Sequence, residues 1–317
     1  MDAAPITDAE ALLAESRRPL VIGIGGGGDV VGALATAEAC RLYHGAQPMV
    51  GGVTWERRVI DPLPGPRSLA EIENGRELAP GVLAAGPDTR VRDNGVAFAE
   101  ARMAGFLGEE TVLVDVTRGP REIAAGIEAA AASLHRDLVV FVDVGGDALA
   151  HGGEPGLASP LCDALMLAAA AGISELPVLG GIFGPGCDGE LTPAEVLERV
   201  AELAAAGGLS GVRGLTPPVV ERLEGAVEAV PTEASAQALR CFRGEHGTSE
   251  IRGGRRRVQL SPLGAITIYF DVAAALGSAA RLAAAVRGAS GLEEANETLR
   301  GLGLRTELDY ERAMVDR

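Results

Sequence analysis

Short apolar runs alternate with longer stretches of helical periodicity through the first two thirds of the chain. The apolar runs predict strands at 19–24, 48–53, 111–116, 138–142 and 176–182. The longer stretches predict helices at 30–43, 96–107, 121–134, 157–170 and 193–206. Strands and helices that alternate at this spacing form a mostly parallel sheet with right-handed crossovers. We therefore predict an α/β fold, with a mostly parallel Rossmann-like sheet and helices on both of its faces.

The pattern changes after residue 213. It predicts helices at 217–229, 232–242, 272–286 and 292–302, a hairpin at 251–260 around Gly253-Gly254, and a last strand at 265–271. We therefore predict two units. Residues 1–213 form a Rossmann-like ligand-binding core, and residues 214–317 form an appended α+β subdomain that packs on the core.

The segment 54–92 interrupts the alternation with a Pro-rich and charged sequence. A loop of that length without secondary structure is usually either functional or disordered. The one tryptophan of the chain favours a functional loop, because disordered segments are poor in aromatic residues. The sequence allows an ordered lid over a binding site or a disordered loop. The candidate substrate-binding residues in it are Trp55, Arg57 and Arg58.

Three glycine-aspartate loops follow apolar runs, at 24–29, 144–147 and 184–190. Parallel strands end at one edge of a sheet, and open α/β folds bind ligands at that edge, where the strand order reverses. The three loops therefore predict one shared ligand site.

The first loop suits a phosphate or a carboxylate. Its glycines expose backbone N–H groups at the start of a helix, and Asp29 is expected as the N-cap of that helix. Gly23, Gly25 and Gly28 satisfy a dinucleotide-binding spacing, but the acid expected at the end of the second strand to bind a ribose is absent from residues 50–54. The alternative is a tight turn that lets the helix pack on the strand. The predicted anion-binding residues are Gly25, Gly26, Gly27, Gly28 and Asp29.

The second loop places Asp143 and Asp147 four residues apart at a strand end. Oxygen ligands of this kind favour Mg²⁺, which needs only one or two protein carboxylates beside a substrate phosphate. The predicted metal ligands are Asp143, Asp147 and Glu154, and the predicted substrate-binding residues nearby are Gly145, Gly146 and Ser159. The alternative is that Ser159 caps a helix beginning at Pro160 and that Asp163 lies solvated on that helix.

The third loop carries Gly186, Cys187, Asp188 and Glu190. A cysteine near a helix N-terminus can have a lowered pKa and act as a nucleophile. The two acids beside it would raise the pKa of the thiol, which favours a structural cysteine instead. Gly186 is predicted to bind substrate, and Asp188 is predicted to act in catalysis because its loop leaves the same sheet edge.

Composition narrows the chemistry further. All 28 basic residues counted as Lys or Arg are arginines, which excludes Schiff-base, P-loop-lysine and Ser-Lys mechanisms. The net charge of -16 argues against a nucleic-acid partner. The basic cluster of Arg252 and residues 255–257 is interpreted as an anion clamp or as protection of an edge strand.

The chain has no feature of a membrane or secreted protein. No apolar run approaches the ~18 residues of a membrane span, and the acidic N-terminus does not resemble a signal peptide. Its four cysteines form no CxxC pair. We expect a cytoplasmic protein.

Five motifs together resemble one protein family. They are the segments 25–34, 51–57, 143–147, 156–161 and 184–190. They are similar to those of family eleven fifty-two of the domains of unknown function, found in archaea and bacteria, over residues 19–310. The resemblance implies a single unit with a shared site, but it implies no reaction.

The favoured hypothesis is an enzyme that binds a phosphorylated small molecule or nucleotide with Mg²⁺ at the carboxyl edge of the sheet, for group transfer or related chemistry. Alternatives are a nicotinamide-dependent oxidoreductase or lyase, a lyase or hydrolase with a Cys187 thiol, and a metabolite-binding protein without turnover. A small molecule is the expected partner, and a homo-oligomer is allowed. The predicted catalytic residues are Asp143, Asp147, Asp188 and Cys187.

Overall fold

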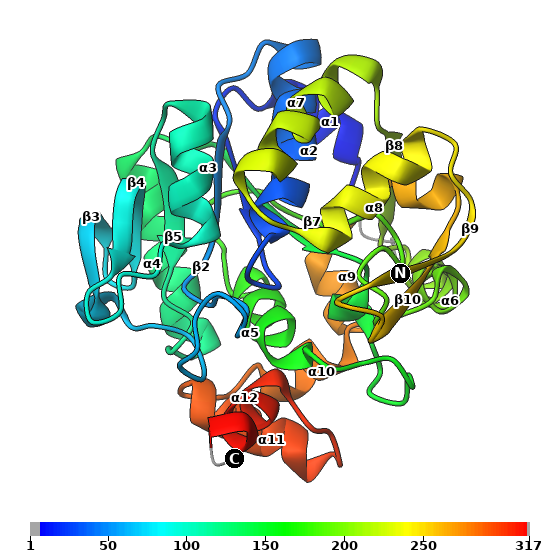
Figure 1. Cartoon of the computed structure of the whole chain (residues 1–317). Helices are drawn as coiled ribbons and strands as arrows, with labels where there is room; N and C mark the ends of the chain where they lie inside the picture. The colour runs from blue at the N-terminus through cyan, green and yellow to red at the C-terminus, as the bar shows by residue number, and fades with distance from the viewer. Residues whose placement is uncertain (1–6, 316–317) are drawn as a thin grey trace, which may run out of the picture.

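A computed structural model describes residues 7–315 and contains one large mixed sheet covered by helices (Figure 1). The sheet has nine strands in the order β3-β4-β5-β2-β1-β6-β7-β11-β8. Their bounds are β1 (Pro19–Gly23), β2 (Met49–Val53), β3 (Ile72–Ala79), β4 (Val82–Val91), β5 (Thr111–Val114), β6 (Leu138–Val144), β7 (Val178–Phe183), β8 (Leu209–Gly214) and β11 (Ile266–Phe270).

The central strands β5, β2, β1, β6 and β7 are parallel, as the alternation of apolar runs and helices predicts. Strands β2 to β5 lie on one side of β1 in the sheet, and β6 and β7 lie on the other side. Strand order therefore reverses between β1 and β6, where Ile22 pairs with Phe141. Crevices at such a reversal are where open α/β folds bind ligands.

Helices cover both faces of the sheet, as predicted (Figure 1). On one face, residues of α4, α5 and α10 share a hydrophobic core with Ile22 and Phe141, and on the other, residues of α2, α3 and α7 share one with Val21 and Val140. The α-helices are α1 (Ala9–Glu15), α2 (Asp29–His44), α3 (Ala99–Leu107), α4 (Pro120–Ser133), α5 (Pro160–Ala170), α6 (Pro193–Ala205), α7 (Pro217–Ala229), α8 (Glu233–Phe242), α9 (Val272–Leu276), α10 (Arg281–Val286), α11 (Leu292–Gly301) and α12 (Glu307–Val315). Three short 3-10 helices are η1 (Leu69–Glu71), η2 (Asp147–Leu149) and η3 (Pro262–Ala265).

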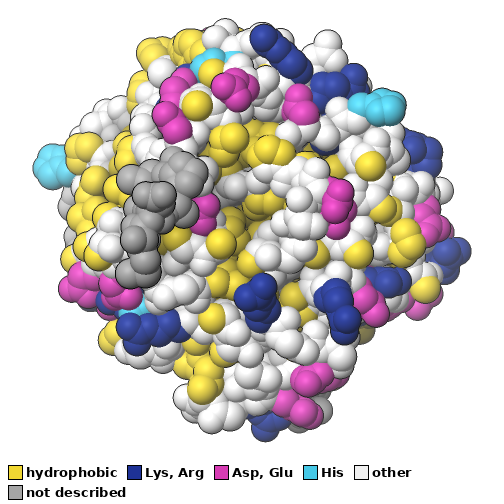
Figure 2. Space-filling model, turned by 180° about the vertical axis from the view of Figure 1, so that it is seen from behind, with side chains coloured by type: hydrophobic (Ala, Val, Ile, Leu, Met, Phe, Trp, Pro, Cys, Tyr) yellow, Lys and Arg dark blue, Asp and Glu magenta, His cyan; other side chains and the backbone are white. Residues whose placement is uncertain are grey.

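Within the described part of the chain, no helix is long and apolar enough to cross a lipid bilayer. On the face of the molecule opposite to that of Figure 1, arginine and acidic side chains are interspersed, with hydrophobic atoms exposed between them (Figure 2).

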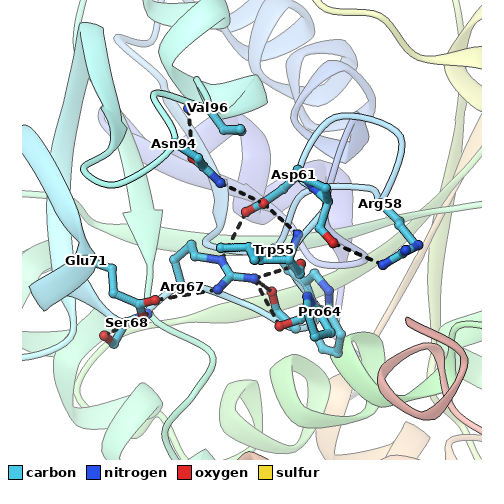
Figure 3. A network of polar contacts seen from close by, with 12 residues as sticks. Trp55, Arg58, Asp61, Pro64, Arg67, Ser68, Glu71, Asn94 and Val96 are labelled. Atoms are coloured by element: carbon cyan, nitrogen blue, oxygen red, sulfur yellow. Dashed lines mark hydrogen bonds and ion pairs between the residues drawn. The ribbon is translucent and has the colours of Figure 1, made fainter. Parts of the chain in front are cut away.

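The prediction of a structureless segment at 54–92 is wrong. Its second half forms η1 and the antiparallel pair β3 and β4, and β4 pairs with β5 to extend the sheet. The first half is a loop organised by the buried side chain of Arg67. The guanidinium lies 3.0 Å from the Asp61 carboxylate and donates to the carbonyl oxygens of Leu63, Pro64 and Gly65 (Figure 3). We call residues 55–68 the Arg67 loop.

The division at residue 213 cuts through the sheet. Strand β11 comes from the second predicted unit, yet it lies antiparallel between β7 and β8 of the first. Its mostly buried residues cover the edge that β7 would otherwise leave unpaired. The predicted hairpin is the separate pair β9 (Gly247–Ile251) and β10 (Arg256–Leu260), and the single helix predicted at 272–286 is divided into α9 and α10.

The last described helix, α12, joins distant parts of the chain. The Glu307 carboxylate accepts hydrogen bonds from the backbone N–H groups of Leu161 and Cys162 at the start of α5. The Glu311 carboxylate accepts one from the indole N–H of Trp55 and one from the N–H of Gly65. Helix α12 therefore fixes both α5 and the Arg67 loop.

Helix α2 packs so closely on the sheet that we expect position 32 not to tolerate a side chain. A Cβ atom on Gly32 would lie 2.3 Å from Cγ2 of Val144 and 3.0 Å from Cδ1 of Phe183. We expect Gly32→Ala to lower the free energy of unfolding by about 1–3 kcal/mol in urea titrations, because a filled core has no room for it. The matched control is Gly301→Ala in α11, where no heavy atom lies within 4 Å, and it should stabilise by at most about 1 kcal/mol. Equal stabilities for the two variants would contradict this packing.

Candidate functional site

Six carboxyl groups lie close together at the carboxyl edge of the sheet, beside the reversal of strand order. They fall into two groups of three, and within each group one carboxylate oxygen per residue lies within 4.8 Å of the others. We call Asp29, Asp143 and Asp163 the first triad. The second triad is Asp147, Asp188 and Glu190. The structure therefore brings together acids from all three glycine-aspartate loops, as predicted from their strand ends.

Glycines allow the carboxylates to approach the backbone this closely. Gly145 has φ +123°, and a Cβ atom there would lie 2.1 Å from Oδ1 of Asp188. A Cβ atom on Gly25 would lie 2.7 Å from Oδ2 of Asp29 and 3.2 Å from both carboxylate oxygens of Asp163. A larger residue at either position would displace members of the triads.

Some triad oxygens are held by hydrogen bonds. Oδ2 of Asp29 accepts from the N–H of Gly25 at 2.9 Å. The Glu190 carboxylate accepts from the N–H of Ala158 and from both the N–H and the hydroxyl of Ser159. These bonds fix the positions of the carboxylates before any ligand is present.

Other triad oxygens have no partner. Among residues 7–315, Oδ1 of Asp163 and Oδ1 of Asp188 are buried and make no hydrogen bond. Asp163 is 2% exposed and Asp188 is 4% exposed. A buried carboxylate oxygen without a partner carries a desolvation cost, typically more than the 1–3 kcal/mol of a neutral group. Each triad contains one such atom.

Burial raises the pKa of the five aspartates in the two triads, and repulsion from neighbouring carboxylates adds to the effect. The pKa of Asp143 is raised to about 7, chiefly by burial. Burial and then the charge of Asp163 raise the pKa of Asp147 well above its ordinary value, and Asp163 and Asp188 behave in the same way. The Arg252 guanidinium opposes the shift at Asp188. Such a site can hold protons near neutral pH or exchange them for a cation.

Asp29 is not the N-cap that the sequence suggests. Helix α2 begins at Asp29 itself, with Gly28 in the cap position. The Asp29 carboxylate instead turns back to the N–H of Gly25, which closes the loop and places the carboxylate beside Asp163.

The four glycines of the first loop divide into two pairs. The N–H of Gly25 donates to Asp29, and the N–H of Gly27 donates to the carbonyl oxygen of Trp55. Within the described residues, the N–H groups of Gly26 and Gly28 donate no hydrogen bond. These two amides are therefore the N–H groups of the loop that have no acceptor in the described part of the chain.

The predicted substrate-binding residues of segment 54–92 lie at different distances from this loop. Arg57 packs on it, since a Cβ atom on Gly27 would lie 2.9 Å from Cγ of Arg57, and its guanidinium donates to the carbonyl oxygen of Pro231. Trp55 is buried, and its indole N–H is used by Glu311. Arg58 donates to the carbonyl oxygen of Pro62 in the Arg67 loop (Figure 3).

Glu154, a predicted metal ligand, lies in neither triad. It accepts hydrogen bonds from the N–H groups of His151 and Gly152, and Arg199 lies 3.6 Å away. Ser159 occupies the N-cap position of α5, but its hydroxyl donates to Glu190 at 2.6 Å instead of capping the helix.

In the third loop, Asp188 and Glu190 belong to the second triad, whereas Cys187 belongs to neither triad. The Cys187 thiol is buried, and a hydrogen bond to Cys241 together with burial raises its pKa well above the usual value. Gly186 has φ +78°, and a Cβ atom there would lie 2.8 Å from Cδ of Pro193, so this glycine is required by the turn.

Three acids near the site are absent from the predicted set. Asp163 lies in α5, in which every residue from Pro160 to Ala170 is buried. The sequence signal for Asp163 was a single aspartate within an otherwise apolar helix. At the end of β2, the Glu100 carboxylate lies against Gly52, and Oε2 of Glu56 is buried without a partner in residues 7–315. Two acids therefore lie near the end of β2, although that strand contains none.

A small cleft of about 140 Å³ adjoins the second triad. It shares Glu190 with that triad and lies between the third loop and strand β10. Its polar lining includes Thr192, Glu195, Arg257 and Gln259. This cleft offers room for part of a small ligand next to the acids.

Comparison with known proteins identifies a family and no activity. Residues 20–315 match the model of a family described as "Protein of unknown function (DUF1152)". Searches of curated proteins and of solved structures give no significant match. The function is therefore argued from the site.

The raised pKa of Asp143 predicts how stability changes with pH. An Asp has an ordinary pKa of 3.8, whereas the pKa of Asp143 in the folded protein is about 7. Between these values the folded protein holds a proton that the unfolded chain has released. The contribution of Asp143 to the free energy of unfolding therefore falls as pH rises from about 4 to 7, by at most about 1.4 kcal/mol per pH unit.

Urea titrations of the wild type and of Asp143→Asn in EDTA measure this contribution as a difference. We expect the stability of the wild type relative to the variant to decrease from about pH 5 to about pH 7.5. A difference that stays constant or increases over this range would contradict the raised pKa.

Proposed function

We propose that this chain, which belongs to the DUF1152 family, is an enzyme that binds Mg²⁺ and a phosphorylated small molecule or nucleotide at the carboxyl edge of its parallel sheet. The family description names no activity, so the proposal rests on the site. One observation carries it: buried carboxylates with unpartnered oxygens lie beside a glycine loop with free backbone N–H groups.

The cluster of carboxylates is suited to bind a hard divalent cation. Carboxylate oxygens are the ligands that Mg²⁺ takes from proteins, and it usually completes its shell with water and substrate phosphate. Asp143 lies in β6, Asp147 begins η2 just after that strand, and each belongs to one of the two triads. A cation there would replace the protons that the raised pKa values otherwise favour.

The first loop supports an anionic ligand. The N–H groups of Gly26 and Gly28 lie at the start of α2, whose N-terminal partial positive charge attracts a phosphate. Arg57 packs on the same loop. A phosphate between these donors and a cation would be neutralised from both sides.

The roles of the side chains follow from their chemistry. When bound, the cation would polarise the phosphate and offset the charge that develops during group transfer. Without a cation the pKa of Asp143 is about 7, so Asp143 is suited to act as a general base only where it does not itself ligate the cation. Since the chain has no lysine, the cationic side chains available are Arg57, which packs on the loop, and Arg252 and Arg256, which pair with Glu190.

A second candidate function is a nicotinamide-dependent oxidoreductase or lyase. The absence of an acid after the second strand argues against it in the sequence, but Glu56 and Glu100 lie at that strand end. Carboxylates at this position bind the ribose hydroxyls of dinucleotides in Rossmann folds. A dinucleotide that binds without a cation would favour this candidate.

Thermal-shift measurements test the favoured proposal. We expect a nucleotide or sugar phosphate to raise the melting temperature by roughly 5 °C at 100 times its Kd, and only with Mg²⁺. Asp147→Asn should remove the shift while the protein stays folded, and the control Glu154→Gln should keep it. Absence of a shift for every phosphorylated ligand, or a full shift in Asp147→Asn, would contradict the proposal.

The thiol alternative predicts a different outcome. Because the Cys187 thiol is buried and its pKa is raised, we expect Cys187→Ser to keep the Mg²⁺-dependent shift within experimental error. Circular dichroism checks that the variant is folded. A folded variant that loses ligand binding would instead indicate a direct role for the thiol.

A further inference from the structure

We infer that the two triads are two separate cation sites, so that the sheet edge binds a pair of divalent cations. The inference rests on the proposed function, because it places cations at the same acids. It goes further by giving the number of cations and by assigning Asp29 and Asp163 as ligands together with Asp143.

The geometry supports one cation for each triad. Carboxylate oxygens around a single six-coordinate cation lie up to about 4–5 Å apart, since each metal–oxygen bond is about 2.0–2.6 Å. The oxygens of each triad satisfy this limit within 4.8 Å, and the six acids form two such groups instead of one. The two triads adjoin, because Asp143 of the first and Asp147 of the second lie four residues apart in the chain, where β6 leads into η2.

An unpartnered oxygen points to a missing ligand in each triad. Among residues 7–315, Oδ1 of Asp163 in the first triad and Oδ1 of Asp188 in the second are buried without a hydrogen bond. Each side chain is more than nine-tenths buried. Other members are already fixed by backbone donors, as Asp29 is by Gly25. Each triad thus combines a fixed carboxylate with one that lacks a partner.

The distribution of charge favours a cation in each triad. Among the described residues, Arg252 and Arg256 are the basic groups that pair with triad members, and both pair with Glu190 of the second triad. The acids Asp29, Asp143 and Asp163 have no ion pair with a basic side chain in this part of the chain. A cation in the second triad alone would leave the first triad uncompensated.

The balance of charges also indicates two divalent cations. With all six acids ionised, the carboxylates carry six negative charges, and the two arginines offset two of them. Two divalent cations offset the other four, whereas one leaves two negative charges facing the glycine loop. An anionic phosphate would be repelled by that remainder. A pair of cations therefore makes the site compatible with the proposed substrate class.

Binding of Mn²⁺ to the full chain tests the inference, because this ion takes the same oxygen ligands and is paramagnetic. After treatment with EDTA and desalting, we expect isothermal titration calorimetry to give two Mn²⁺ per chain. Low-temperature electron paramagnetic resonance should show magnetic coupling between them. Asp163→Asn and Asp188→Asn should each bind one Mn²⁺ and lose the coupling. The control Glu154→Gln changes an acid outside both triads and should bind two.

Asparagine keeps the shape of aspartate and removes a buried charge, so the variants are expected to fold, and circular dichroism checks this. Asp29→Asn tests the first triad independently if Asp163→Asn is unfolded. One Mn²⁺ per wild-type chain, or two in a folded Asp163→Asn or Asp29→Asn variant, would overturn the inference. The Mg²⁺-dependent shift by a phosphorylated ligand would survive that result, so failure of the inference is distinct from failure of the proposed function.

Discussion

The repulsion among buried carboxylates is the constraint on which the arrangement of this protein depends. Asp143 and Asp163 are almost fully buried at one sheet edge, although each prefers water when ionised. The fold lowers this cost with backbone N–H groups at the ends of β1, β6 and α5, and with two arginines on the hairpin of β9 and β10. The rest of the cost falls on protonation or on a bound cation, so fold stability and ligand binding draw on the same groups.

Elements with a strong local pattern could be predicted from the sequence. The central strands are continuous apolar runs because both faces of a parallel sheet are buried. The glycine-aspartate loops follow those strands, so their convergence at one edge follows from parallel order alone. This reasoning located Asp143, Asp147 and Asp188 near one another without any knowledge of side-chain positions.

Features that depend on distant pairing could not be predicted in this way. The strand β3 lies at a sheet edge, and its sequence is mostly exposed and charged, so it has no apolar run. Strand β11 has a clear apolar run, but its place between β7 and β8 depends on which edge is available. Asp163 is similar, because a helical aspartate gives no sign in sequence of whether it faces solvent or other carboxylates.

The position of α12 has a consequence for the order in which the molecule is completed. Its contacts reach back 146 residues to α5 and 256 residues to Trp55. Contacts of such long sequence separation form late, because the entropy of closing long loops must be overcome first. A growing chain can therefore build its parallel strands while the start of α5 is still unsecured. The start of α5, and with it the position of Asp163 among the other acids, is therefore secured only when α12 has docked.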